Sequence, residues 1–260
     1  MCHTVEHFST AWVKLRVREQ TEWAVLSVHS GKMPGKLIVF EGVEGSGKST
    51  QLRRLEHWLQ QHPGLQKLQA CGKVAEIIVT REPGGTALGQ ALRALLLDGQ
   101  SEMALGARAE LMLYAADRAQ HIDEVILPAL QRGSWVLCDR FIDSTVAYQG
   151  YGRGLSLSLI ENLNHIATQG HPGDLTLWLQ IDAEQGLARS RSRGQLDRME
   201  QTSLEFHRQV QQGFETLAGQ HPERIVPIDA TPAEEVVAQQ IQTVMEQRLK
   251  AWYGKRFQTF

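Results

Sequence analysis

Residues 37–50 read Leu37-Ile-Val-Phe-Glu-Gly-Val-Glu-Gly-Ser-Gly-Lys-Ser-Thr50. An apolar, β-branched run ends in a glycine-rich turn, and polar residues with good helix formers follow, so the pattern predicts a strand, a loop and a helix. Gly42, Gly47, Lys48 and Ser49 have the spacing G-x-x-x-x-G-K-[ST], which is typical of the phosphate loop of nucleotide-binding proteins. The alternative is a glycine-rich turn that precedes a lysine by chance, and the strand-to-helix context disfavours it.

The glycines of this loop have a physical reason. A loop that wraps a polyphosphate directs successive backbone N–H groups inward, which requires φ and ψ values that glycine reaches without strain. The following helix adds unpaired N–H donors and the positive end of its dipole. We expect Lys48 to reach the β- and γ-phosphates and the Ser49 hydroxyl to hold Mg²⁺. The ATP-binding residues expected here are Gly42, Val43, Glu44, Gly45, Ser46, Gly47, Lys48, Ser49 and Thr50.

The composition is that of an ordinary globular protein, with 42% hydrophobic and 22% charged residues among 260. A formal net charge of −2 disfavours nucleic acid held by bulk electrostatics. Three widely separated cysteines without a C-x-x-C pair favour a reducing compartment over a disulfide framework or a zinc site. No apolar run approaches the ~18 residues that cross a bilayer. We therefore expect a cytoplasmic protein with no nucleic-acid or membrane partner.

Residues 1–34 differ from the rest of the chain, because tryptophans, acids and bases are interspersed there. A transit peptide would be poor in acids, and a secretory signal would have a longer apolar stretch. We expect this extension to be disordered or misassigned, with Met33 as the true start. The intact mass of the native protein tests this, since a species that retains residues 1–32 contradicts it. Residues 35–260 are expected to form a single domain.

Strands and helices alternate along this domain, which predicts a doubly wound α/β fold: a mostly parallel five-stranded sheet with helices on both faces. The proline in the fifth strand indicates an edge or a strand end. The expected strands are residues 37–41, 76–80, 135–139, 175–181 and 224–228. The expected helices are residues 50–61, 86–97, 103–130, a helix after a turn at 151–154, 183–193, 203–218 and a last helix after Pro232.

The carboxyl ends of these strands carry chemically informative residues, and ligands bind at those ends in open α/β sheets. The phosphate loop follows the first strand, Arg81 the second, Asp139 and Arg140 the third, and Asp182 the fourth. A GTPase would have an N-K-x-D motif, which is absent from the sequence. A hydrolytic ATPase usually ends its third strand with two acids, whereas Arg140 follows Asp139. A cation there favours a second bound anion over activated water.

Transfer between two nucleotides requires cations more than a general base, because the attacking phosphate oxygen is already ionised. Arg81, Arg118 and Arg140 are candidates for the acceptor phosphate, since a guanidinium fork matches phosphate oxygens. Each could instead be a solvated surface residue. Arg140 is the strongest candidate because it stands directly at a strand end.

Five motifs resemble, in order, the motif series of bacterial thymidylate kinases. The similarity extends from about Lys36 to the final helix, and several long motifs in register make it more specific than the phosphate loop alone. The motifs are Glu41-Gly-Val-Glu-Gly-Ser-Gly-Lys-Ser-Thr50, Thr80-Arg-Glu-Pro-Gly-Gly-Thr86, Tyr114-Ala-Ala-Asp-Arg-Ala-Gln-His121, Asp139-Arg-Phe-Ile-Asp-Ser-Thr-Val-Ala-Tyr-Gln-Gly150 and Arg191-Ser-Arg-Gly-Gln-Leu-Asp-Arg-Met-Glu200.

The resemblance implies transfer of the γ-phosphate of ATP to dTMP, giving dTDP and ADP, with Mg²⁺ as cofactor. It implies that Glu44 contacts the deoxyribose 3′-hydroxyl, that Tyr114 stacks on thymine, and that Ser49 and Asp139 hold the metal, the latter directly or through water. Tyr114 could instead be a core residue, since it lies beside Leu111 on a helix face. The residues implied to surround the dTMP phosphate are Arg81, Arg118 and Arg140, and those implied to line the base and sugar pocket are Ser144, Thr145, Tyr148 and Gln149.

The charged segment at about residues 189–202 is expected to form a short lid. Arg189 and Arg193 are four residues apart and share a helix face, and Arg198 follows. These arginines could simply complement the helix dipole near its end. In the functional interpretation they close on the ATP phosphates and exclude water. Since the phosphate loop has no arginine, the resemblance places the catalytic one in the lid; we choose Arg193, ahead of Arg189 and Arg191.

Together these observations predict a dTMP kinase that acts in dTTP biosynthesis and, by resemblance, forms a homodimer. The expected catalytic residues are Lys48, Asp139, Arg140 and Arg193. Two alternatives stay open: a P-loop kinase for another nucleoside monophosphate, and a P-loop ATPase or regulatory nucleotide-binding protein. A coupled assay of ADP release over a panel of monophosphates distinguishes them.

Overall fold

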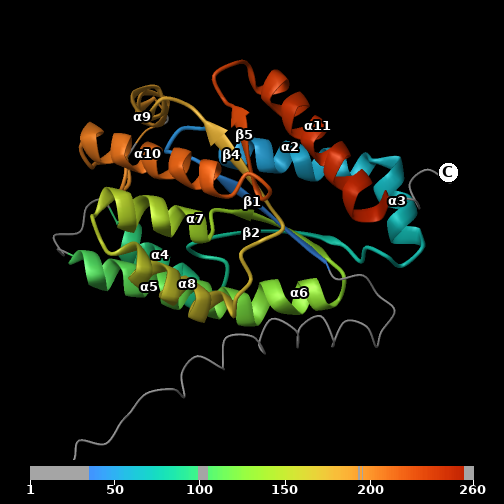
Figure 1. Ribbon diagram of the computed structural model, residues 1–260, viewed down its shortest axis with the longest axis horizontal. Helices are drawn as coiled ribbons and strands as arrows, with labels where there is room; N and C mark the ends of the chain where they lie inside the picture. The colour runs from blue at the N-terminus through green and yellow to red at the C-terminus, as the bar shows by residue number, and fades with distance from the viewer. Residues whose placement is uncertain (1–34, 99–104, 193, 195, 255–260) are drawn as a thin grey trace, which may run out of the picture.

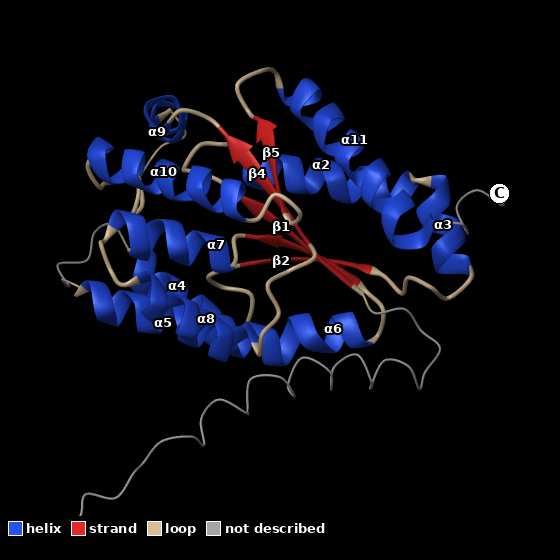
Figure 2. Ribbon diagram, viewed as in Figure 1, coloured by secondary structure: helices blue, strands red, loops and turns tan. Residues whose placement is uncertain are grey.

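The computed structural model describes residues 35–98, 105–192, 194 and 196–254, so the expected extension at residues 1–34 lies outside the described residues. One sheet of parallel strands runs through the centre of the molecule (Figure 2). Its strands are β1 (Lys36–Glu41), β2 (Ile77–Arg81), β3 (Trp135–Asp139), β4 (Leu175–Gln180) and β5 (Ile225–Asp229). Their spatial order is β2-β3-β1-β4-β5, and every neighbouring pair is parallel. The expected α/β fold is confirmed, with the proline-containing strand at an edge.

Helices cover both faces of the sheet (Figure 1). The helices α2 (Lys48–Gln61) and α11 (Glu234–Tyr253) pack together on the face to which Ile38 and Phe40 point. On the opposite face, Trp178 of β4 stacks on Phe214 of α10 (Leu204–Gln220), with ring centroids 6.4 Å apart. The other helices are α3 (Pro63–Ala70), α4 (Ala87–Leu97), α5 (Ala107–His121), α6 (Leu127–Gln131), α7 (Ile142–Thr145), α8 (Leu157–Thr168) and α9 (Ala183–Arg191), with the π-helical turns η2 (Ile122–Ile126) and η3 (Val146–Gly152).

The central strand β1 is buried on both faces, which is why its sequence is a continuous apolar run. Leu37 and Val39 pack with η2 and α6, whereas Ile38 and Phe40 join the core cluster that includes α2 and α11. Its parallel neighbours β3 and β4 end at the same edge of the sheet, so the residues that follow β1 and β3 are brought together there.

The expected long helix at 103–130 is interrupted. In its described part, α5 passes into η2 and then α6, and the backbone N–H of Leu127 donates to the carbonyl of Ile122, five residues back. Pro128 explains the change, because proline has no N–H to donate and its ring crowds the preceding turn of an α-helix. The expected turn at 151–154 likewise begins later, since η3 continues through Gly152.

The expected helices did not include residues Pro63–Ala70, which form α3. His62 caps this helix by accepting the N–H of Leu65 at Nδ1 (3.2 Å), and proline stands at the start, where its missing N–H costs nothing. Leu65 and Leu68, three residues apart, are buried on one face. None of the helices in the described part of the chain has the length and apolar character that crossing a bilayer requires.

Candidate active site

The phosphate loop lies between the carboxyl end of β1 and the N-terminus of α2, as expected. Gly45 and Gly47 have φ of 70° and 91°, in the left-handed region that favours glycine. A Cβ at Gly45 would also lie 2.0 Å from the carbonyl oxygen of Gly186 in α9, so a side chain does not fit there. The loop conformation therefore requires glycine at position 45 and favours it at position 47.

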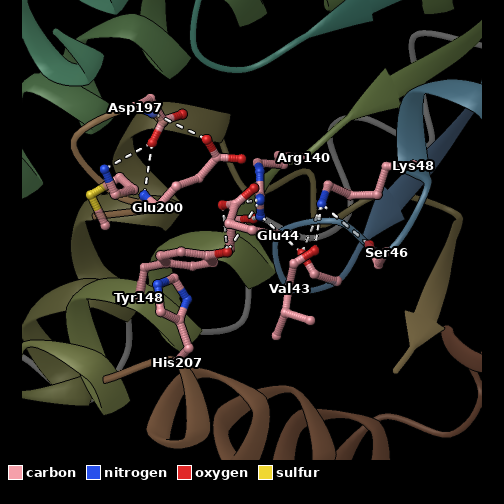
Figure 3. A network of polar contacts seen from close by, with 12 residues as sticks. Val43, Glu44, Ser46, Lys48, Arg140, Tyr148, Asp197, Glu200 and His207 are labelled. Carbon is pink, nitrogen blue, oxygen red and sulfur yellow. Dashed lines mark hydrogen bonds and ion pairs between the residues drawn. The ribbon is translucent and has the colours of Figure 1, made fainter. Parts of the chain in front are cut away.

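Lys48 is buried inside this loop. Its Nζ donates to the carbonyl oxygens of Gly42 (3.0 Å) and Val43 (2.9 Å), and the Ser46 hydroxyl is 3.4 Å away (Figure 3). Burial, together with the nearby charge of Arg140, lowers the pKa of Lys48 to about 8. The ammonium is thus held at the loop by weak neutral acceptors, and the oxygens of an anion would be stronger partners for it.

The residues expected to hold the metal lie next to each other. The Ser49 hydroxyl donates to Oδ2 of Asp139 at 2.7 Å, although the two residues are 90 positions apart. Both line the same open cavity. A hydroxyl and a carboxylate are hard oxygen donors of the kind that Mg²⁺ prefers, with its other positions left to water and phosphate. In the part of the chain that the structure describes, no group of three or more His, Cys, Asp or Glu side chains is close enough together to hold a metal by itself.

Arg140 lies at the meeting point of several candidate residues. Its Nη2 donates to Oε1 of Glu44 (2.5 Å) and the Tyr148 hydroxyl (3.1 Å), and its Nη1 donates to the Ser144 hydroxyl and the Gly42 carbonyl, both at 3.1 Å (Figure 3). Its backbone φ of 70° is unusual for a residue with a side chain. The surrounding structure enforces this conformation, since the Arg140 N–H donates to the carbonyl of Phe40 in β1.

Glu44 is ionised in this environment. Burial would raise its pKa, but the positive charges of Arg140 and Lys48 outweigh that effect and lower the pKa to about 2. The Tyr148 hydroxyl donates to the same Oε1 at 2.8 Å. A carboxylate, a guanidinium and a phenol are therefore locked together beside the phosphate loop.

Two cavities meet at this cluster. An inner cavity of about 100 Å³ is lined by Tyr114, Arg118, Ser144, Thr145, Tyr148 and Gln149, all of which the sequence assigns to the acceptor. An outer cavity of about 600 Å³ is lined by Gly45, Lys48, Ser49, Arg81 and Asp139. Glu44, Glu82, Arg93, Arg140 and Asp197 line both. Of the loop residues, Gly42, Val43 and Ser46 do not line either cavity; their oxygens contact Lys48 instead.

The three candidate arginines take different positions. Arg81 is exposed and lines the outer cavity, whereas Arg118 is 2% exposed and lines only the inner one. The Arg118 guanidinium donates to Oε2 of Glu82 (2.8 Å), Oδ1 of Asn164 (2.6 Å), the Thr145 hydroxyl (2.9 Å) and the carbonyl of Phe141 (3.0 Å). Arg118 thus borders only the inner cavity and Arg81 only the outer one, and of these three arginines Arg140 alone lines both. Tyr114 is half-buried and lines the inner cavity, outside the two core clusters of the described residues.

Two residues beside the site, Glu41 and Arg93, were not predicted from the sequence. Glu41, fully buried at the end of β1, accepts the N–H groups of Phe141 (2.8 Å) and Ser144 (3.0 Å) and the Ser144 hydroxyl (2.5 Å). Burial and the nearby charge of Asp143 raise the pKa of Glu41 to about 7. Arg93 of α4 lines both cavities and donates to the carbonyl of Pro83 at 3.0 Å. The position of a charged residue at the end of a buried strand could have indicated a role for Glu41. No sequence pattern indicated a role for Arg93.

The arginines of the charged segment at about residues 189–202 were expected to bind the ATP phosphates. Arg189 donates to the carbonyls of Ala230 (3.0 Å) and Thr231 (3.1 Å) after β5, and its Cβ lies near Gly45, but it lines neither cavity. Arg193, our candidate for the catalytic arginine, lies outside the described residues. The Asp182 side chain accepts the N–H groups of Glu184 and Gln185 and so caps α9, which accounts for an acid at the end of β4.

Comparisons with known proteins agree on one family. The family model described as thymidylate kinase matches residues 40–241. The curated thymidylate kinase of Cyanothece sp. is 55% identical over 228 residues, covering 85% of this chain and 97% of that protein. The thymidylate kinase of Trichodesmium erythraeum is 55% identical over 224 residues, covering 85% and 99%. The crystal structure of thymidylate kinase from Ehrlichia chaffeensis superposes with a TM-score of 0.64 at 31% identity, covering 82% of this chain and 100% of that one.

Proposed function

Since the chain belongs to the thymidylate kinase family and has that family's ATP-dependent nucleoside monophosphate kinase activity, we propose how its two cavities hold the substrates. The inner cavity takes the nucleoside of dTMP and the outer cavity takes ATP. The observation that carries this proposal is the position of Arg140, which lines both cavities and lies beside the phosphate loop.

The inner cavity has the chemistry to recognise a pyrimidine nucleotide. Tyr114 offers an aromatic face, and base stacking of this kind contributes about 1–3 kcal/mol in nucleic-acid complexes. Arg118 and Gln149 line the cavity, and hydrogen bonds to neighbouring residues fix the direction of both side chains. A guanidinium held in this way by four partners suits base recognition more than phosphate binding. The acceptor phosphate then lies towards Arg140 and Arg81. We assign Glu44 and Tyr148 to the sugar, because both line the inner cavity and both bond to Arg140.

The outer cavity has the chemistry to bind a polyphosphate. The loop N–H groups and the N-terminus of α2 attract anions, and Lys48 exchanges its carbonyl acceptors for phosphate oxygens. Arg189 fixes the loop after β5 beside the phosphate loop. The residues present fit Mg²⁺, and Ser49 and Asp139 would hold it, directly or through water. When bound, the ion neutralises charge on the β- and γ-phosphates.

In the transfer step an oxygen of the dTMP phosphate forms a bond to the γ-phosphorus, and the bond from that phosphorus to the leaving oxygen of ADP breaks. No proton needs to be removed from the nucleophile. Arg140 and Lys48 therefore act by holding the two anions together and by stabilising charge on the transferring group. Arg193 is the proposed lid cation for the same group, on sequence grounds.

The test is a coupled assay of ADP release with dTMP, dUMP, dCMP, dGMP and dAMP as acceptors. We expect turnover that depends on dTMP and exceeds that with each of the others. Turnover with a different monophosphate would contradict the assignment of the inner cavity, and acceptor-independent hydrolysis would contradict the proposed use of both cavities.

We also propose a homodimer that acts in the cytoplasm to supply dTTP. Support for dimerisation comes from exposed apolar side chains on α4, α5 and α8, helices that contact one another in the order α4, α5, α8. Ile166 is 72% exposed and Met112 is 60% exposed, and exposed apolar side chains that gather on adjoining helices favour a protein–protein interface. Sedimentation velocity should show a dimer that Met112→Glu converts to a monomer. A monomeric wild-type protein would contradict this.

A further inference from the structure

Glu110 is a buried carboxylate that the proposed function does not use. It lies in the first turn of α5 and is 1% exposed. Its Oε1 accepts from Nε2 of Gln149 (2.9 Å) and Nε of Arg153 (3.3 Å). Its Oε2 lies 3.2 Å from Nη2 of Arg153 and 2.6 Å from Nη2 of Arg198. One carboxylate therefore joins three segments that are far apart in sequence.

Two cations and an amide are an unusually large set of partners for one buried side chain. Burial would raise the pKa of Glu110, but hydrogen bonds from Gln149 and Arg153 outweigh that effect and lower it. Glu110 is consequently ionised near neutral pH. A buried ion pair contributes little to stability compared with apolar packing, so stability alone is a weak reason for this cluster.

The partners of Glu110 belong to two parts of the chain, η3 and the charged segment. Gln149, from η3, lines the inner cavity. Arg198 belongs to the charged segment, and it is fixed further because its Nε donates to the carbonyl of Leu96 (2.7 Å) and its N–H to the carbonyl of Leu97 (3.2 Å), at the end of α4. Glu110 thus connects Gln149, in the wall of the acceptor cavity, to Arg198 in the charged segment.

The segment held by Arg198 lines the cleft through its neighbours. Asp197 lines both cavities, Met199 the inner one and Glu200 the outer one. Asp197 closes the turn, since its Oδ1 accepts the N–H groups of Met199 (2.8 Å) and Glu200 (2.9 Å). Figure 3 shows Asp197 and Glu200 beside Arg140, with which they line the outer cavity. Movement of Arg198 would therefore move residues that border both substrates.

We propose that Glu110 is a positioning residue for phosphoryl transfer, which holds Gln149 in the acceptor cavity and, through Arg198, holds the turn at residues 196–200 against the cleft. This inference rests on the proposed placement of dTMP in the inner cavity. The inference predicts different kinetic effects for the two contacts. Loss of the Gln149 contact should raise the KM for dTMP, whereas loss of the Arg198 contact should release the turn at residues 196–200 and lower kcat.

The experiment compares Glu110→Gln with Arg198→Gln. Glu110→Gln weakens both contacts, and losing a hydrogen bond to a charged group costs about 1.5–3 kcal/mol, so the KM for dTMP should rise about 10- to 100-fold and kcat should fall. Arg198→Gln weakens only the contact to the turn, so kcat should fall about tenfold while the KM for dTMP changes less than about threefold. Backbone hydrogen exchange in residues 196–202 should accelerate in both variants. The double variant should be no slower in kcat than the worse single variant, because both act on one contact.

The control is Glu235→Gln. Like Glu110, Glu235 lies in the first turn of a helix and pairs with an arginine, Arg54, at 2.8 Å, but its side chain is exposed. It should leave kinetics and hydrogen exchange unchanged. If Glu110→Gln lowers only the unfolding temperature, with unchanged KM, kcat and exchange in 196–202, the cluster is structural and the inference is wrong. Absence of dTMP-dependent turnover in the wild type would instead contradict the proposed function, while hydrogen exchange would still report on Glu110.

Discussion

The inner and outer cavities share a border at Arg140 but are built in opposite ways. In the inner cavity, Arg118 is buried and donates to four partners, Glu82, Asn164, Thr145 and Phe141. In the outer cavity, Arg81 is exposed, and Lys48 contacts two carbonyls and a hydroxyl of its own loop, which are neutral acceptors. The inner cavity is about 100 Å³ and the outer one about 600 Å³.

In the proposed placement of the substrates, this difference suits one cleft to two kinds of recognition. A neutral base is distinguished by the direction of a few hydrogen bonds, which requires donors whose orientation is set before binding. A polyphosphate is bound by charge and by backbone N–H groups, which tolerate movement and gain from exchanging weak acceptors for strong ones. We therefore expect changes in the outer cavity to act mainly on kcat and changes in the inner cavity mainly on the KM for dTMP.

The largest effect is expected for Lys48→Ala, in the outer cavity. Removing a cation that contacts the transferring phosphoryl group should lower kcat by about 10³-fold, since such preorganised charges are among the largest catalytic contributions. The KM for dTMP should change little. The measurement is steady-state kinetics with each substrate varied, and the control is Lys250→Ala on the exposed side of α11. A kcat within tenfold of the wild type would remove Lys48 from this role.

The second largest effect is expected for Arg193→Ala. Loss of one transition-state cation should lower kcat by about 10²-fold, again with a nearly constant KM for dTMP. Arg208→Ala is the matched control, because Arg208 is an exposed arginine paired only at 3.6 Å with an exposed glutamate, Glu184. An unchanged kcat would leave the outer cavity without its expected lid cation and would direct attention to Arg189.

The inner cavity is tested by Arg118→Lys, which keeps the charge but loses the guanidinium geometry. The KM for dTMP should rise about 10- to 100-fold, equivalent to one charge-assisted hydrogen bond, while the KM for ATP stays constant. Arg132→Lys, at an exposed position after α6, is the control. A larger change in the KM for ATP than in that for dTMP would break the proposed division between the cavities.

The smallest effect is a pH dependence set by Lys48. Its pKa in the free protein is lowered to about 8, so the ammonium is charged below that pH and neutral above it. The kcat/KM for ATP, which reports on the free enzyme, should therefore fall about tenfold between pH 7.5 and pH 9. At saturating ATP the decline in kcat should begin at higher pH, because bound phosphate favours the charged form. Lys48→Arg should show no decline near pH 8, and a flat wild-type profile to pH 9.5 would contradict the assignment.

The sequence predicted the parallel sheet, its edge strand and the phosphate loop because these depend on local patterns: apolar runs, glycine spacing and strand-helix alternation. It did not predict α3, because the residues that indicate this helix are few: a capping His62, Pro63 and two leucines. It also placed an uninterrupted helix where Pro128 produces a π-helical turn. The first error concerns a short helix that burial of Leu65 and Leu68 stabilises, and the second concerns the local effect of Pro128 on backbone hydrogen bonds.

The candidate residues of both cavities were identifiable from sequence motifs, since they follow strand ends or form contiguous stretches that resemble those of the thymidylate kinase family. The division of labour among the arginines was not, because Arg81, Arg118 and Arg140 are the same residue type and differ only in what surrounds them. The position of Glu41 at the end of a buried strand marked it as unusual but did not identify its partners, the N–H groups of Phe141 and Ser144. No pattern indicated that Glu110 joins Gln149 to Arg198. These contacts span 39 to about 100 positions in the chain. Only folding brings such groups within 3 Å of one another, and only their burial makes the resulting charge pairs strong enough to orient a substrate.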